Sequence, residues 1–227
     1  MIESSFEDQI LTLTLAGPSA VNALNEQNYD GLHHALLAAR DDERVRAVVL
    51  AASGHKAFCA GADLKEYADR DHDEAERLQM HFLLRALTDL VEFPKPVVAA
   101  VHAPAIGAGM MLACACDEIV MADSSWMSLP EAQINIPTPI AAVVVGRWVR
   151  QSFMHVLLQR AERMGAESCL AHGLVQVLAP ADAVLQAARD RLSIYLTMQP
   201  HVYAVNKRWL NRGVRDQLVL ASQAVHG

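Results

Sequence analysis

Two stretches of the chain could stabilise negative charge with main-chain groups instead of side chains. AFCAGADLKEY covers residues 57–67 and HAPAIGAGMML covers residues 102–112. Each follows a buried apolar run and passes through small residues into an expected helix. Free backbone N–H groups at such a helix start favour an anion, and small residues let a substrate carbonyl approach the main chain. Two such turns side by side would form an oxyanion hole, whereas either alone is typical of close packing.

Other chemistries are not favoured by the motifs. The Gly-Ala-Gly at residues 107–109 does not extend to G-x-G-x-x-G, and a phosphate-binding lysine motif is absent from the sequence. Cys114 and Cys116 form a C-x-C pair without a second pair or a nearby histidine, so we do not expect a metal site. The four cysteines are typical of buried thiols in a reducing compartment.

Composition and charge narrow the class of protein further. The 227 residues include 19 Lys and Arg against 26 Asp and Glu, and a net charge of −7 does not attract nucleic acid. The N-terminal MIESSFEDQ carries acidic residues and is not a signal peptide. The apolar runs are interrupted by His, Pro and Gly, which is typical of a core and not of a membrane span. We therefore expect a soluble, cytoplasmic protein with neither nucleic-acid nor membrane partners.

The hydrophobic pattern indicates the elements that must position the two turns. Residues 9–17 alternate as a half-buried strand, and apolar runs predict buried strands at 45–53, 97–103 and 118–123. Helical spacing predicts a first helix that begins after Asn25 as its N-cap and a last helix from about residue 203. Between them it predicts helices at 73–92, 140–160, 166–172 and 181–197. Alternating strands and helices, followed by helices alone, indicate an α/β core with a helical C-terminal part.

Several motifs, in the same order along nearly the whole chain, resemble the crotonase (enoyl-CoA hydratase/isomerase) superfamily. They are AVNAL, AFCAGADLKEY, PKPVVAAVHAPAIGAGMMLACACDEIVMAD, MSLPEAQINIPTP and AESCLAHGLVQVLAP. The resemblance implies an α/β fold with a crotonase-like ββα spiral core at 1–180 that binds an acyl-CoA thioester. It also implies a helical trimerisation region at 181–227, short for the family, and a homotrimer or hexamer. Neither a metal nor a redox cofactor is implied, because coenzyme A is part of the substrate.

The resemblance also assigns roles to individual residues. It places the oxyanion-hole N–H groups at Ala62 and Ala108, where glycine is usual at the second position. It implies that the substrate and its CoA moiety contact Ala20, Val21, Ala60, Asp63, Leu64, Lys65, Gly107 and Met111. Lys65 would meet a CoA phosphate or the adenine, although the residue alone also fits a solvated surface lysine.

Glu131 is the expected catalytic base. Hydratases of the family use two glutamates, and the corresponding positions here are Met111 and Glu131. Leu129, Pro130, Ile134 and Ile136 flank Glu131, so we expect a partly desolvated carboxyl with a raised pKa. A glutamate that follows proline at a helix start, stabilised by the helix dipole, would fit the same residues.

A single carboxylate beside Met111 resembles the Δ3,Δ2-enoyl-CoA isomerase branch, which shifts a double bond from C3 to C2 through an enolate. The alternatives are an enoyl-CoA hydratase that uses one glutamate and a catalytically silent acyl-CoA-binding homologue. The short C-terminal region predicts an acyl end of the pocket that is open to solvent.

Overall fold

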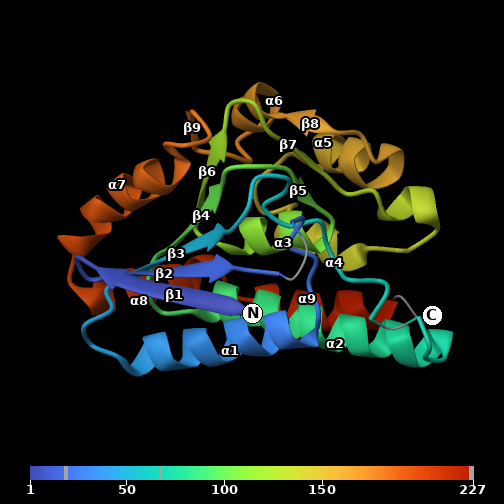
Figure 1. Cartoon of the computed structure of the whole chain (residues 1–227), viewed down its shortest axis with the longest axis horizontal. Helices are drawn as coiled ribbons and strands as arrows, with labels where there is room; N and C mark the ends of the chain where they lie inside the picture. The colour runs from blue at the N-terminus through green and yellow to red at the C-terminus, as the bar shows by residue number, and fades with distance from the viewer. Residues whose placement is uncertain (18–19, 67, 225–227) are drawn as a thin grey trace.

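The computed structural model describes residues 1–17, 20–66 and 68–224, with the backbone alone at residue 72. Two sheets and the helices around them make up this part of the chain (Figure 1). The strands are β1 (Ile2–Glu7), β2 (Ile10–Leu15), β3 (Ala47–Ala52), β4 (Val97–Val101), β5 (Ala105–Ile106), β6 (Glu118–Ala122), β7 (Trp126–Ser128), β8 (Met164–Gly165) and β9 (Val177–Ala179). The helices up to residue 144 are α1 (Glu26–Asp41), α2 (His72–Glu92), α3 (Ala108–Ala115), the 3₁₀ turn η1 (Glu131–Ile134) and α4 (Pro139–Val144). The later ones are α5 (Gln151–His155), the π-helical η2 (Val156–Arg160), α6 (Ala166–Ala171), α7 (Val184–Leu196), α8 (Pro200–Leu210) and α9 (Val214–Gln223).

The larger sheet has the strand order β1-β2-β3-β4-β6-β9, and its strands from β2 onward run parallel. Side chains that alternate along β3 enter two different cores. Val48 and Leu50 join the core beneath α1, α2 and α3, whereas Ala47 and Val49 pack with Val184, Ala188 and Leu192 of α7 on the other face. Helices cover both faces, which explains the continuous apolar runs of these strands.

The smaller sheet, with the order β5-β7-β8, lies beyond the end of β4 and prepares the turn into α3. The chain leaves β4 at Val101, pairs briefly in β5 with β7, and then enters α3, whose eight residues are all buried. This arrangement confirms the α/β fold expected from the sequence. Among the described residues, no helix combines the length and the apolarity that crossing a membrane requires.

Strand β1 was not expected, because its pattern carries little hydrophobic signal. It is exposed along almost its whole length and pairs antiparallel with β2. Asp8 and Gln9 connect the two strands with positive φ angles of 49° and 66°, as a two-residue hairpin requires.

The single helix expected at 140–160 is wrong, since the structure divides this segment into α4, α5 and η2. Between α4 and α5 the indole of Trp148 donates to the carbonyl of Cys114 at 2.8 Å, and Arg147 donates to Asn211 at 2.8 Å. The apolar spacing continues across the break because both halves bury side chains, and so it did not reveal the break. Similarly, the last expected helix is two helices, α8 and α9, with Gly213 at φ 80° before α9.

Candidate active site

A β-bridge and backbone hydrogen bonds hold the two small-residue turns side by side. Cys59 and Ala105 form a parallel β-bridge. The amide of Ile106 donates to the carbonyl of Cys59 at 2.9 Å, and the amide of Phe58 donates to Pro104 at 3.0 Å. The two stretches that the sequence analysis selected are therefore adjacent in space, as an oxyanion hole requires.

Glycines allow this close approach. Gly61 has a φ of 93° and Gly107 a φ of 55°, conformations that other residues rarely adopt. A Cβ atom added at Gly61 would lie 3.7 Å from the nitrogen of Ala108, and one added at Gly109 would lie only 2.4 Å from the carbonyl oxygen of Cys59. Helix α3 thus packs directly against the main chain of the other turn.

The amides of Ala62 and Ala108 are available as donors. Ala108 is the first residue of α3, so its N–H group has no acceptor within the helix. Around Ala62, the amide of Leu24 donates to Gly61 and the amide of Asp63 donates to Leu24, both at 2.8 Å. Neither Ala62 nor Ala108 has an acceptor for its own N–H group within the described chain.

The carboxylate of Glu131 lies beside Gly107, next to the amide of Ala108. It opens η1 directly after Leu129 and Pro130, and its Oε1 atom would lie 2.7 Å from a Cβ atom added at Gly107. The other oxygen, Oε2, is buried and has no hydrogen-bond partner in the described chain. Burial raises the pKa of the Glu131 carboxyl, an effect that its own backbone amide opposes only in part. Burial and a raised pKa suit a general base beside two unused N–H donors.

A pocket opens between these groups and helix α2. The described residues that line it are Tyr29, Ala60, Gly61, Ala62, Leu64, Glu76, Gln79, Met80, Leu83, Ile106, Gly107, Ala108, Met111, Pro130, Glu131, Ile134, Ile136, Pro137, Thr138 and Ile140. Met111 is buried at 2% exposure and adds an apolar surface close to Glu131. Leu64, Ile134 and Ile136 are 54%, 52% and 38% exposed, so the rim of the pocket is apolar and open to solvent.

The structure brings together most of the site residues expected from the sequence. Ala60, Ala62, Leu64, Gly107, Ala108, Met111 and Glu131 all line the pocket. Ala20, Val21, Asp63 and Lys65 do not line it, although Val21 accepts a hydrogen bond from the amide of Ala60 at 3.0 Å. Asp63 accepts from the amide of Lys65 at 3.1 Å and shapes the turn, and the Lys65 side chain is exposed. The first two residues of the PSAVNAL motif lie outside the described residues.

The part of the pocket wall formed by α2 and α1 was not expected from the sequence. Helix α2 supplies Glu76, Gln79, Met80 and Leu83, and α1 supplies Tyr29. The spacing of 76, 79, 80 and 83 marks one helix face and was visible in the sequence. That spacing is equally typical of a core face, so only the packing of α2 over α3 shows what it lines.

Comparison with known proteins identifies the family. The family model described as enoyl-CoA hydratase/isomerase matches residues 5–226. A carnitinyl-CoA dehydratase from Salmonella arizonae is 32% identical over 211 residues, which are 92% of this chain and 79% of that relative. An enoyl-CoA hydratase/carnithine racemase structure from Magnetospirillum magneticum is 27% identical with a TM-score of 0.85, covering 93% of this chain and 80% of the other. A probable enoyl-CoA hydratase structure from Mycobacterium tuberculosis, 22% identical, shares the fold with a TM-score of 0.90 over 99% and 94% of the two chains.

The fold and the site thus define a crotonase-type enzyme that acts on acyl-CoA. The chain belongs to the enoyl-CoA hydratase/isomerase family.

Proposed function

We propose that the protein is an enoyl-CoA isomerase that moves a double bond from C3 to C2 of an acyl-CoA thioester. The observation that carries the proposal is the half-buried Glu131, whose Oε2 atom is buried without a partner in the described chain, beside two N–H donors and the apolar Met111. One proton carrier in an apolar pocket suits a reaction that neither adds nor removes water.

The reaction needs two proton transfers at one carboxylate. Glu131 takes a proton from C2 of the 3-enoyl thioester, and the electron pair moves onto the thioester oxygen. The N–H groups of Ala62 and Ala108 donate to that oxyanion, where each such donor contributes about 2.7–4 kcal/mol in comparable sites. Protonated Glu131 then returns its proton at C4, the C2–C3 double bond forms and the enolate collapses. Atoms and charge balance without a further reactant.

A second candidate is hydration of a 2-enoyl-CoA or the reverse dehydration. The similar proteins that carry the names carnitinyl-CoA dehydratase and enoyl-CoA hydratase favour it. In this reaction Glu131 would exchange protons both with C2 and with the oxygen at C3. Met111 cannot assist, because a thioether carries no transferable proton.

A two-substrate assay separates these candidates. Isomerisation of a 3-enoyl-CoA gives a conjugated thioester of unchanged mass, which absorbs in the ultraviolet. Hydration of a 2-enoyl-CoA removes that absorbance and adds the mass of one water. Turnover of the 3-enoyl-CoA alone supports the isomerase, and turnover of the 2-enoyl-CoA alone overturns it. Tight acyl-CoA binding without turnover of either substrate would instead indicate a silent binding protein.

We also infer that the protein assembles as a homotrimer or hexamer through its C-terminal helices. Large apolar side chains on α7, α8 and α9 are more than half exposed in the single chain: Ile194, Val205, Trp209, Leu210 and Leu220. Such residues are typical of a surface that is covered by another subunit. Light scattering tests the inference, since a monomer at micromolar concentration would contradict it.

A further inference from the structure

The two N–H donors of the site are held in different ways. The carbonyl of Gly107 and the N–H group of Ala108 belong to one peptide group, and that carbonyl accepts from the amide of Met111 at 3.0 Å at the start of α3. Ala62 lies outside every helix of the described chain and forms an isolated parallel β-bridge with Leu24. The second donor is therefore oriented by its own helix, whereas the first depends on a segment that precedes it by about forty residues.

The amide of Leu24 fixes the direction of the Ala62 N–H group. It donates to the carbonyl of Gly61 at 2.8 Å, and this carbonyl belongs to the same peptide group as the Ala62 N–H. The C=O and N–H of a trans peptide group point in opposite directions. A Gly61 carbonyl held on Leu24 therefore turns the Ala62 N–H away from Leu24. The same hydrogen bond polarises the peptide group and makes its N–H a stronger donor.

Asn22 fixes the loop that carries Leu24. Its side chain is buried, and its Nδ2 atom donates to the carbonyls of Ser53 at 2.7 Å and Ala57 at 3.0 Å. Its Oδ1 atom accepts from the amide of Gly17 at 3.1 Å. The backbone of Asn22 has a φ of 49°, a left-handed conformation that asparagine adopts more readily than most residues. One side chain thus connects the segment after β2, the segment after β3 and the start of the first small-residue turn.

We propose that Asn22 is a positioning residue of the oxyanion hole, which aims the N–H group of Ala62 through the amide of Leu24. The inference rests on the proposed function, because it requires that Ala62 donate to the thioester oxygen. Asn22 is not among the described residues that line the pocket, so it acts through the main chain of its neighbours. An asparagine that only stabilised the fold would not change how strongly a bound thioester carbonyl is polarised.

The expected effect on catalysis is a part of what a whole donor contributes. Loss of one oxyanion donor lowers kcat by about 10²–10³-fold in comparable sites. Without the Asn22 side chain the Ala62 donor is still present but no longer held in one direction. We therefore expect kcat to fall by about 10–100-fold and KM to change less, since the donor matters most in the transition state.

Vibrational spectroscopy of a bound ester tests the inference without depending on turnover. Butanoyl-CoA, isotope-labelled at the thioester carbonyl, has no double bond to move or hydrate. Binding to the wild-type protein should lower its C=O stretching frequency, because the N–H donors polarise the carbonyl. Asn22→Gly permits the positive φ and removes only the side chain. It should return the bound frequency part of the way to that of the free ester, and calorimetry should still show binding.

Asn211→Gly is the matched control. Asn211 also connects two segments, since it donates to the carbonyl of Val91 and accepts from Arg147, both at 2.8 Å, and it does not line the pocket. This variant should lower the free energy of unfolding and leave both the bound C=O frequency and kcat unchanged. An equal change of frequency in Asn211→Gly and Asn22→Gly would reduce the effect of Asn22 to general destabilisation and overturn the inference.

A second variant removes the proposed contact itself. Replacing Leu24 by the corresponding α-hydroxy acid exchanges its amide N–H for an ester oxygen and keeps the buried side chain. It should change the bound frequency in the same direction, whether or not Asn22→Gly folds. The wild-type frequency in either folded variant would overturn the inference and leave the proposed function intact. If butanoyl-CoA does not bind to the wild-type protein, or binds without a change of frequency, the proposed function fails together with the inference.

Discussion

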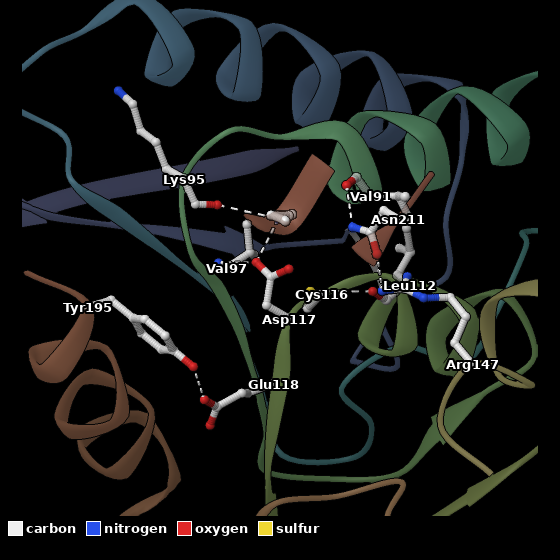
Figure 2. A network of polar contacts seen from close by, with 11 residues as sticks. Val91, Lys95, Val97, Leu112, Cys116, Asp117, Glu118, Arg147, Tyr195 and Asn211 are labelled. Atoms are coloured by element: carbon white, nitrogen blue, oxygen red, sulfur yellow. Dashed lines mark hydrogen bonds and ion pairs between the residues drawn. The ribbon is translucent and has the colours of Figure 1, made fainter. Parts of the chain in front are cut away.

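Acidic residues near the two ends of helix α3 differ in whether their carboxylates have partners. At its N-terminal end, Glu131 has an oxygen atom with no partner in the described chain. Beyond its C-terminal end, Asp117 accepts from the amide of Val97 at 2.8 Å (Figure 2). It also accepts from the Lys207 ammonium at 2.6 Å. The next residue, Glu118, accepts from Arg191 at 2.6 Å and from the hydroxyl of Tyr195.

The presence or absence of a cationic partner distinguishes acidic residues that stabilise the fold from one that can do chemistry. The acids at the start of β6 hold α7 and α8 against the sheet, and their partners neutralise them. Glu131 has no such partner, so its burial raises its pKa and leaves it able to exchange a proton. The comparison predicts that changes at one end of α3 act on activity and changes at the other act on stability.

The largest expected effect is that of Glu131→Gln on activity. Loss of the base should lower kcat by about 10²–10⁴-fold. The free energy of unfolding should stay the same or increase, because a neutral amide is less costly to bury than an unpaired carboxylate. Steady-state kinetics, urea unfolding and calorimetry of acyl-CoA binding test this together. Strong destabilisation would show that Glu131 is a structural acid like Asp117.

Breaking the pair at the other end should have the reverse outcome. Lys207→Met leaves Asp117 buried without its cation, which should lower the free energy of unfolding by about 3–5 kcal/mol. The kcat of the folded enzyme should not change. Arg208→Met is the control, since Arg208 is exposed on the same helix. A loss of kcat in Lys207→Met at unchanged stability would contradict the division of roles.

The raised pKa of Glu131 predicts the pH dependence. Catalysis requires the ionised carboxyl, so kcat/KM should fall about tenfold per pH unit on the acid side, with a midpoint above the ordinary 4.5. For stability the sign is opposite, because the folded state binds this proton more tightly than the unfolded state. The contribution of Glu131 to the free energy of unfolding is therefore present below its ordinary pKa. It is lost as the pH rises through the pKa of Glu131 in the folded state. Glu131→Gln should remove this part of the pH dependence of unfolding, and an unchanged profile would contradict the assignment.

The smallest effect concerns Lys65, which lies outside both ends of α3. If it meets a CoA phosphate, Lys65→Ala should raise KM by about threefold without changing kcat, since an exposed ion pair contributes at most about 1 kcal/mol. The difference should disappear at high salt. Arg208→Ala serves as the surface control, and an identical KM at low salt would show that Lys65 is only solvated.

The sequence predicted the parallel core and the two turns because their signals are local. Buried β-branched runs mark β3, β4 and β6, and Asn25 caps α1 as expected, with its side chain accepting from the amide of Asn28. The strands missed in the sequence are short or exposed. Both faces of β1 are exposed, so it shows no alternation of apolar and polar residues. Strands β5, β7 and β8 have two or three residues each, too few for a periodic pattern.

The sequence predicted that the two turns and Glu131 would lie together, and they line one pocket. Glu76 was not predictable, since a glutamate on an amphipathic helix usually faces solvent. The partners of Asp117 were equally hidden, because Lys207 is 90 residues away in the sequence. Such contacts follow from how α8 packs and not from any local pattern.

The contact between Gly109 and Cys59 has a consequence for how this enzyme can diversify. A hydrogen atom on a glycine, rather than any side chain of the pocket, sets how closely the two donor loops approach. Side chains at positions such as 76, 79 and 111, which line the pocket, can therefore be exchanged without changing how closely the two loops approach. Under the proposed function, a second carboxylate in place of Met111 would enter the pocket beside Glu131 on an unaltered backbone.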